Sequence, residues 1–138
     1  MSEEGTSVAV WDLESEVSEG SIVADMGELL SATIIETFKE SGKYNVVERQ
    51  RLVLVLEELN IGASEMVSDS TRLEIGKIVG ARLMVFGSYT GIGETIMLDL
   101  RKVEVETGRI LKATYKTTTS VDPAELLKIT REAAQALL

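Results

Sequence analysis

The sequence predicts one α/β domain with α+β character, in which helices flank a mixed sheet of five strands. Strand-like and helix-like segments alternate over roughly the first 80 residues, which is typical of parallel strands joined by crossover helices. Three strand-like segments then follow one another between residues 82 and 119, as in antiparallel hairpins. The expected order is β-α-β-α-α-β-β-β-α. The chain has 138 residues, which suits a single domain spanning 1–138, and we expect residues 1–6 to be disordered or left over from cloning.

The first half of the chain supplies two strands and three helices. The apolar run 7–13 predicts a strand covered on both faces, with Trp11 in the core. Apolar residues recur every three or four positions in 22–41, which predicts a helix ended by Gly42. Glu48 and Arg49 are expected to form a helix cap and a local ion pair. The other expected segments are a polar loop at 14–21, a strand at 44–48, a helix at 49–60, and a helix near 69–80 that begins with a Thr71–Glu74 capping box.

The second half supplies three strands and a final helix. Residues 82–89 read as a central strand, and 95–106 as its neighbour. In 95–106 the apolar residues change parity, so we expect a bulge near Arg101–Lys102 or a change in the buried face. After a hairpin at 106–108, the strand 109–119 should turn a dry face inward. The members of that face are Leu111, Ala113 and Tyr115. Asp122 and Pro123 then mark the start of the last helix.

Composition removes most kinds of catalytic chemistry. The chain has no cysteine and no histidine, so thiolate nucleophiles, disulfides, the usual zinc sites and histidine-based triads are excluded. We therefore predict no enzymatic activity, no catalytic residues, no metal and no cofactor. The formal net charge is −9, which repels phosphate backbones and makes nucleic acid an unfavourable partner.

Negative charge is concentrated at the start of the chain. Before Lys39 there are only acids and no bases, whereas acids and bases balance from Ile61 onward. The loop after the first strand carries part of this charge. Its glutamates are our candidate residues for electrostatic docking of a protein partner: Glu14, Glu16 and Glu19.

The closely spaced glycines Gly87, Gly91 and Gly93 do not form a phosphate loop. A dinucleotide fingerprint needs a third glycine after G-x-G-x-x and then a helix, whereas Gly93 is followed by strand-like residues. There is also no P-loop lysine. We interpret this segment as a bent connection between antiparallel strands.

The acidic stretch 12–20 leaves two less favoured alternatives. It could hold calcium, although its sixth and twelfth positions, Val17 and Val23, do not fit an EF-hand. Asp12 and Glu14 could also act as paired carboxylates in hydrolysis, but no electrophilic partner accompanies them. A solvated loop is the simpler interpretation.

Three segments together resemble a known family. They are "VAVWDLE", "YNVVERQRLVLVLEEL" and "GARLMVFGSYTG…LDLRKVEVETGRIL", and they cover about residues 7–119. In this order they resemble the periplasmic domain of the curli secretion-channel (CsgG-like) family and of related outer-membrane lipoproteins, which include activators of peptidoglycan synthases. They more distantly resemble the amino-terminal domain of TolB.

The resemblance implies an exported, often lipid-anchored envelope domain that acts through protein contacts and assembles into rings in channel members. Two features depart from those members. Only "TGIGET" stands where they insert membrane hairpins, which is far too short to cross a bilayer. The loop "ESEVSEGS" also lacks the aromatic residue of their constriction. The fold is therefore expected without the pore, and the lipid-bearing cysteine would precede residue 1.

These observations lead to one main hypothesis for function. We expect a non-enzymatic, periplasmic, outer-membrane-associated interaction domain that supports secretion or envelope assembly, or regulates a partner enzyme. Its partners would be an envelope protein or further copies of itself, and it would meet the membrane only through a lipid anchor outside this chain. The alternative is a sensor that binds a small ligand or cation at the carboxyl ends of the parallel strands, near Asp12 and Gly87. A module of a larger cytoplasmic or sensory protein also remains open.

Overall fold

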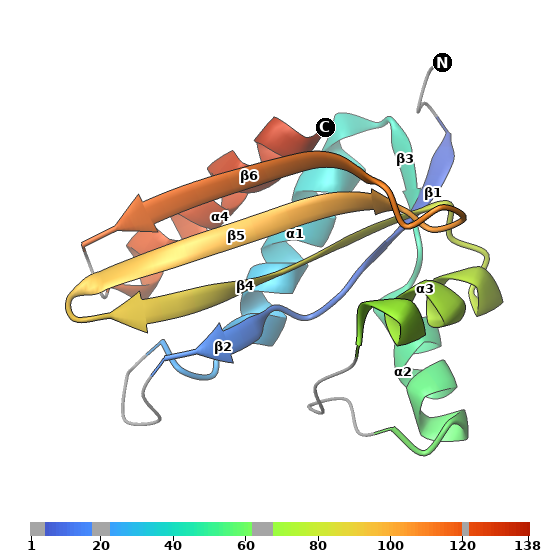
Figure 1. Ribbon diagram of the computed structural model, residues 1–138. Coiled ribbons are helices and arrows are strands. Elements are labelled where there is room, and N and C mark those ends of the chain that lie inside the picture. The colour runs from blue at the N-terminus through green and yellow to red at the C-terminus, as the bar shows by residue number, and fades with distance from the viewer. Residues whose placement is uncertain (1–4, 18–22, 62–67, 120–121) are drawn as a thin grey trace.

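The computed structural model describes residues 5–17, 23–61, 68–119 and 122–138, which form a single layered domain (Figure 1). Thr6 already belongs to the first strand, whereas residues 1–4 lie outside the described part. The strands are β1 (Thr6–Val10), β2 (Glu14–Glu16), β3 (Tyr44–Val46), β4 (Leu83–Ile92), β5 (Thr95–Glu104) and β6 (Ile110–Thr118). The helices are α1 (Gly27–Ser41), α2 (Arg49–Glu58), α3 (Asp69–Ile78) and α4 (Pro123–Leu137).

The strands form one mixed sheet in the order β3-β1-β4-β5-β6. The pairs β1–β3 and β1–β4 are parallel, and β4, β5 and β6 are antiparallel, as the sequence predicted. The described residues contain one strand more than expected. Residues 14–16, predicted as loop, form β2 and pair in parallel with Ser88, Tyr89 and Thr90 of β4. The polar sequence Glu-Ser-Glu gives no strand signal, so its pairing depends on its position beside β4.

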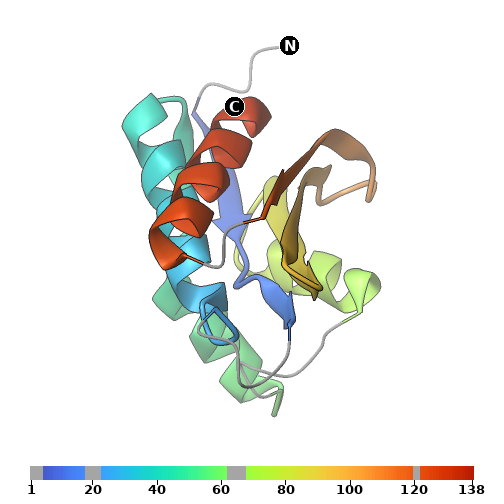
Figure 2. The same cartoon turned by 90° about the vertical axis from the view of Figure 1, so that its left-hand side faces the viewer.

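The two faces of the sheet carry separate cores. Figure 2 shows α1 and α4 on one side of the sheet and α3 on the other. The larger core lies under α1 and α4 and includes Leu30, Phe38, Tyr89 and Leu126. The smaller core is formed with α2 and α3 and contains Trp11, as predicted. It occupies only part of the opposite face of the sheet.

Helix α1 begins later than predicted, at Gly27 instead of residue 22. A Cβ atom at Gly27 would overlap the backbone carbonyl of Leu13, so this close approach requires glycine. The predicted stop is confirmed, because Gly42 caps the helix with φ of 70°.

The other helix starts agree only partly with expectation. Asp122 accepts a hydrogen bond from the Ala124 N–H ahead of α4, as predicted. The cap of α3 is Ser68 and not Thr71, because the Ser68 side chain accepts the Thr71 N–H. Glu48 precedes α2 without a side-chain capping bond, so the predicted cap there is wrong.

Strand β5 changes its buried face, which was one of the two expected outcomes. Ile96, Leu98 and Leu100 lie in the larger core, whereas Val103 and Val105 lie in the smaller one. The pairing of β4 with β5 runs through this point without a shift. The packing on the two faces changes along the strand while the backbone alternation continues.

The bulge is on β6 and not on β5. Lys102 pairs with Lys112, and Val103 pairs with Ile110, so Leu111 is an extra residue on β6. The predicted position along the sheet was correct, since the register shifts between Lys102 and Val103.

The glycine segment is a hairpin, as predicted. Ile92 pairs with Thr95, so only Gly93 and Glu94 form the turn, and Gly93 has φ of 60°. No described helix is long and apolar enough to cross a membrane.

Candidate interaction surface

The acidic residue at the end of β1 is held by side chains from two helices. Asp12 receives hydrogen bonds from Arg49 Nε at 3.1 Å and Nη2 at 2.7 Å, and from Ser31 Oγ at 3.0 Å. Glu28 adds a second carboxylate 3.6 Å from Arg49. The expected local ion pair of Arg49 is therefore wrong, because its main partner lies 37 positions away and not at Glu48.

Charge at this cluster favours the ionised arginine. The hydrogen bonds to Asp12 raise the pKa of Arg49 above its ordinary value, partial burial opposes this, and the charges of Asp12 and Glu28 add to the rise. Since both Asp12 oxygens already accept from a cation, this carboxylate is poorly suited to serve as a calcium ligand or a general base.

Glu14 is likewise occupied by an arginine. Its carboxylate pairs with Arg72, whose Nη1 also donates to Asp69 at 3.0 Å. The Arg72 side chain is only 10% exposed, and its guanidinium lies over the Phe86 ring at 5.0 Å and near the Trp11 ring at 5.9 Å. This ion pair therefore links β2 to α3.

Of the other two predicted docking residues, Glu16 is in the described part of the chain. Glu16 is exposed on β2 and accepts a hydrogen bond from Thr90 Oγ1 at 3.1 Å. Glu19 lies outside the described residues. Glu14 and Glu16 lie beside β4 on the same side of the sheet as α3, because their partners Ser88 and Thr90 alternate with the core residue Tyr89.

No described helix or loop covers a large part of this side of the sheet. Helix α3 covers the end near Phe86, while the long β4–β5–β6 hairpins extend beyond it (Figure 1). We call this surface the open face. From the alternation of the strands, its exposed or half-buried members are Ser88, Thr90, Met97, Asp99, Arg101, Ala113, Tyr115 and Thr117.

The open face corrects the prediction for β6. Tyr115 is 59% exposed and Ala113 is exposed, so their side of the strand is not dry. Helix α4 covers the other side, where Thr114 and Lys116 are half-buried. The side chains of β6 do alternate between two faces, as the sequence indicated, but α4 packs against the face that carries Thr114 and Lys116.

Arg101 is the cation of the open face. Its guanidinium lies 4.9 Å from the centre of the Phe86 ring, on the ring that Arg72 also contacts. Arg72 has two carboxylate partners, whereas Arg101 forms no ion pair with any other described residue. Sequence reasoning missed this stack. One signal was available, since Arg72 shares the helical spacing of the buried residues Ile75 and Val79.

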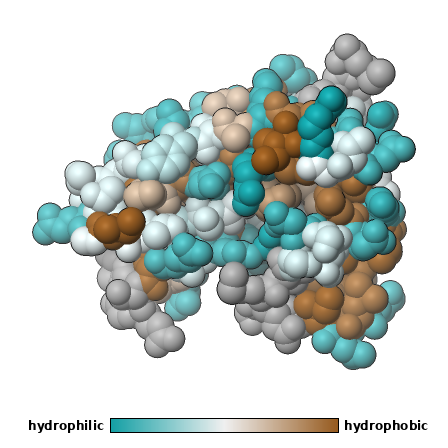
Figure 3. Space-filling model, in the orientation of Figure 1, coloured by the Kyte–Doolittle hydropathy of each residue, from teal (hydrophilic) through white to brown (hydrophobic). Residues whose placement is uncertain are grey.

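The open face is suited to protein contact. In Figure 3 the surface over these strands is mainly of intermediate hydropathy. Tyrosine, methionine and arginine are enriched at protein interfaces, and the face offers all three in Tyr115, Met97 and Arg101. Among the described residues, no group of three or more acidic side chains could hold a metal ion.

Solved structures share this fold. The LpoB C-terminal domain from Salmonella enterica is 21% identical with a TM-score of 0.69, and 83% of each chain is covered. Lipoprotein GNA1162 from Neisseria meningitidis is 13% identical with a TM-score of 0.63, covering 96% of each chain. The PelC dodecamer from Paraburkholderia phytofirmans is 14% identical with a TM-score of 0.58, covering 99% of this chain and 89% of that one.

A family match is more specific than these similarities of fold. No curated protein sequence matches the chain significantly. The protein-family model described as "Curli production assembly/transport component CsgG" matches residues 2–96, which is more than half of the chain. That description concerns assembly and transport, so it supports an interaction role and offers no support for catalysis. The chain therefore belongs to the CsgG family.

Proposed function

We propose that this domain is a non-enzymatic interaction domain of a bacterial envelope lipoprotein, facing the periplasm and docking a protein on its open face. It supports secretion or envelope assembly, or regulates a partner enzyme. The observation that carries the proposal is the exposure of Tyr115, at 59%, in the middle of a long sheet strand that no described helix covers on this side. An exposed tyrosine on such a face supplies the kind of aromatic contact in which protein interfaces are enriched.

The charged residues on and around the open face indicate which charges a partner should carry. Glu16 lies at the rim of the open face next to Thr90, and Asp99 and Arg101 lie on the face itself. The predicted docking loop, Glu14, Glu16 and Glu19, remains a proposal, and Glu16 is its most accessible described member. A partner that places basic side chains against Glu16 and an acidic one against Arg101 would complement this pattern.

The neighbours support a protein partner but do not specify which one. One solved neighbour is named a lipoprotein and another a dodecamer, so we consider both a lipid-anchored protein and an assembly of copies. Static light scattering of the native protein distinguishes them. A multiple of the monomer mass that falls to monomer in Tyr115→Arg would place a second copy on the open face. A monomer in both cases would assign the face to a different protein.

Differential capture tests the docking role itself. The immobilised domain is exposed to native envelope extract as wild type, Tyr115→Arg and Lys128→Glu, where Lys128 is an exposed residue of α4. We expect specific proteins to be retained by the wild type and by Lys128→Glu but lost with Tyr115→Arg. Retention of the same proteins by all three would refute docking on the open face.

The sensor alternative finds no supporting observation at its predicted location. The carboxylate of Asp12 is already paired with Arg49, so a ligand there would have to compete with this ion pair.

A further inference from the structure

Strand β6 forms one border of the sheet. It is the last strand in the order β3-β1-β4-β5-β6, and among the described strands it pairs only with β5 (Figure 1). It has nine residues, whereas β3 at the opposite border has three. A border strand presents a row of backbone N–H and C=O groups with which a further strand can pair. We call this side of β6 the outer edge.

The hydrogen bonds of β5 show how its backbone groups alternate. Successive residues of a strand turn their backbone groups to the two neighbouring strands in turn. Glu104, the last residue of β5, donates its N–H to Arg109 just ahead of β6. Val105 donates its N–H to Arg82, just ahead of β4. Even-numbered residues of β5 therefore bond to β6, and odd-numbered ones bond to β4.

This alternation determines which backbone groups of β6 point outward. The even-numbered residues of β5 pair with even-numbered residues of β6, as Leu100 does with Thr114. The odd-numbered residues of β6 between them turn their N–H and C=O groups away from β5. We call their N–H groups the outward amides, and they belong to Ala113, Tyr115 and Thr117.

The side chains along the outer edge are basic. Residues 109–119 contain Arg109, Lys112 and Lys116 and no acid, although the chain has a net charge of −9. Lys112 and Lys116 lie on the same side of β6, and neither forms an ion pair with another described residue. Lysine at a sheet edge disfavours pairing with neutral or basic strands. The same charges favour an acidic strand, which gives the edge selectivity.

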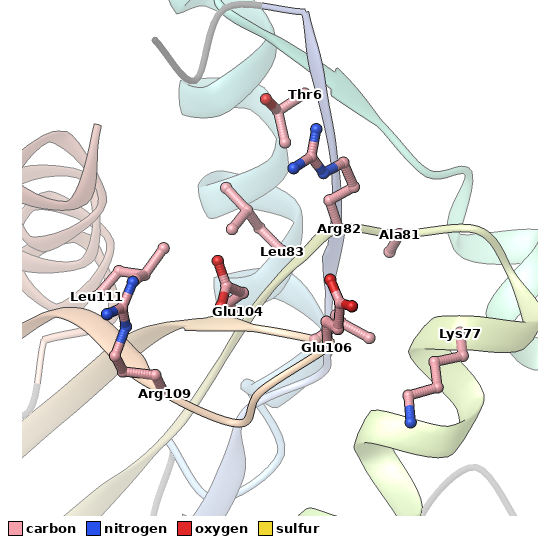
Figure 4. Close-up of a pocket in the computed structure, with 10 residues that line it drawn as sticks. Thr6, Lys77, Ala81, Arg82, Leu83, Glu104, Glu106, Arg109 and Leu111 are labelled. Atoms are coloured by element: carbon pink, nitrogen blue, oxygen red, sulfur yellow. The ribbon is translucent and has the colours of Figure 1, made fainter. Parts of the chain in front are cut away.

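The regular part of the outer edge begins after the bulge. Leu111 is the extra residue there, and together with Arg109 it lines a pocket at the end of the sheet (Figure 4). From Lys112 to Thr117 the register with β5 is unbroken. This stretch matches the usual length of a strand, roughly 5–6 residues.

We propose that an extended, acidic segment of a partner protein adds a strand to the outer edge of β6. Its backbone bonds to the outward amides and their carbonyl groups, and acidic side chains four positions apart lie beside Lys112 and Lys116. A second copy of β6 fits poorly, because pairing two such edges brings lysines together. The inference concerns backbone pairing and does not depend on docking at the open face.

Amide hydrogen exchange, followed by NMR on the whole chain, tests the proposal. The probe is the peptide acetyl-Val-Glu-Val-Thr-Val-Glu-Val-amide, whose glutamates have the spacing of Lys112 and Lys116. Without peptide the outward amides should exchange fast, whereas the Thr114 amide should be protected by its bond to β5. With the peptide at about ten times its Kd, exchange of the outward amides should slow about tenfold.

Two control peptides separate charge from backbone pairing. Replacing both glutamates by lysine should abolish the slowing, because the charges then repel. Methylating the backbone nitrogens of the three central residues keeps the charges and removes hydrogen-bond donors, so this peptide should not slow exchange either.

Variants of the chain connect binding to β6. Lys116→Glu should lose the acidic peptide and bind the lysine peptide instead. Ala113→Pro removes an outward N–H without removing a bond to β5, and it should weaken binding about tenfold. Lys128→Glu on the exposed surface of α4 is the control and should bind as wild type. Thermal unfolding verifies that each variant is folded.

Several results would overturn the proposal. Outward amides that are protected without peptide would mean that the edge is already covered, by a second copy if protection grows with protein concentration. No slowing with the acidic peptide, or equal slowing with either control peptide, would also refute it. Each of these results would leave docking on the open face intact, because that docking is tested by capture with Tyr115→Arg.

Discussion

Arg49 at the start of α2 binds both carboxylate oxygens of Asp12 at the end of β1, with Nε–Oδ1 and Nη2–Oδ2 distances of 3.1 and 2.7 Å. The two residues come from segments that the family resemblance had identified separately. Their contact connects the first strand to the second helix. Ser31 of α1 also takes part, because its Oγ donates a hydrogen bond to Asp12 Oδ1 at 3.0 Å. The cluster therefore fixes three elements at one end of the sheet, and both Asp12 oxygens are occupied in it.

Removing this pair should destabilise the domain modestly. The side chains of Arg49 and Asp12 are 35% and 30% exposed, so solvent screens their attraction, although the two-pronged geometry is favourable. A double-mutant cycle of Asp12→Ala and Arg49→Ala, measured by urea unfolding, should give a coupling free energy of about 1 kcal/mol. Additive effects of the two substitutions would contradict a direct interaction.

The coupling should not change with moderately alkaline pH. Hydrogen bonding to Asp12 raises the pKa of Arg49, so the stabilisation is fully present below the ordinary arginine value and is lost only as pH rises through the higher folded value. The same cycle at pH 7 and pH 9 should therefore give equal coupling. A clear loss at pH 9 would mean that another group titrates in the cluster.

Calcium should leave the unfolding temperature unchanged. The carboxylates of Asp12 and Glu14 are each paired with an arginine, and displacing either arginine would strand a partly buried cation. Thermal scans with millimolar CaCl₂ and with EDTA should superimpose. A rise in unfolding temperature that grows with calcium concentration, and that is lost in Asp12→Asn or Glu14→Gln, would contradict this prediction.

Two tyrosines of the sheet should respond differently to loss of the hydroxyl. The buried Tyr89 hydroxyl accepts the Met26 N–H at 2.9 Å and donates to the Val23 carbonyl at 2.7 Å, which anchors the segment leading into α1. Tyr89→Phe should cost about 1–3 kcal/mol, because a buried N–H loses its acceptor. Tyr115→Phe, at an exposed position, is the control and should be neutral within about 0.5 kcal/mol. If Tyr89→Phe and the wild type had equal unfolding free energies, the hydroxyl of Tyr89 would not anchor this segment.

Gly87 should not tolerate a side chain. A Cβ atom there would overlap the backbone carbonyl of Asp99, and backbone cannot move aside as a flexible side chain can. Gly87→Ala should therefore destabilise the protein by about 1–3 kcal/mol or more in chemical unfolding. Ser88→Ala, on the neighbouring half-buried position, should be close to neutral. A stable Gly87→Ala protein would mean that β4 and β5 lie farther apart than described.

Much of the fold was predictable because periodicity and turn chemistry act locally. The hairpin at Gly93, the stop at Gly42 and the start at Asp122 all follow from backbone preferences of individual residues. The change of apolar parity in 95–106 likewise predicted a bulge or a change in the buried face, and the strand does change its buried face. Strand β2 could not be predicted, because its glutamates disfavour a strand and only its neighbour β4 organises it.

The surfaces were less predictable because they depend on which face a helix covers. Alternation in 109–119 is compatible with burial of either side, and α4 covers Thr114 and Lys116 while leaving Tyr115 exposed. Thr6 and Arg109 line one pocket (Figure 4) although they are distant in sequence, and no local pattern connects them. Ion pairs such as Asp12–Arg49 require the same long-range information.

The most direct test of docking on the open face is site-specific photocrosslinking in the native host. A photoreactive amino acid replaces Tyr115 in the full-length protein, and a second strain carries it at the exposed Lys128 of α4. Docking on the open face predicts a discrete, reproducible crosslinked protein from position 115 that is absent from position 128. Identical products from both positions, or a product from 128 alone, would contradict it.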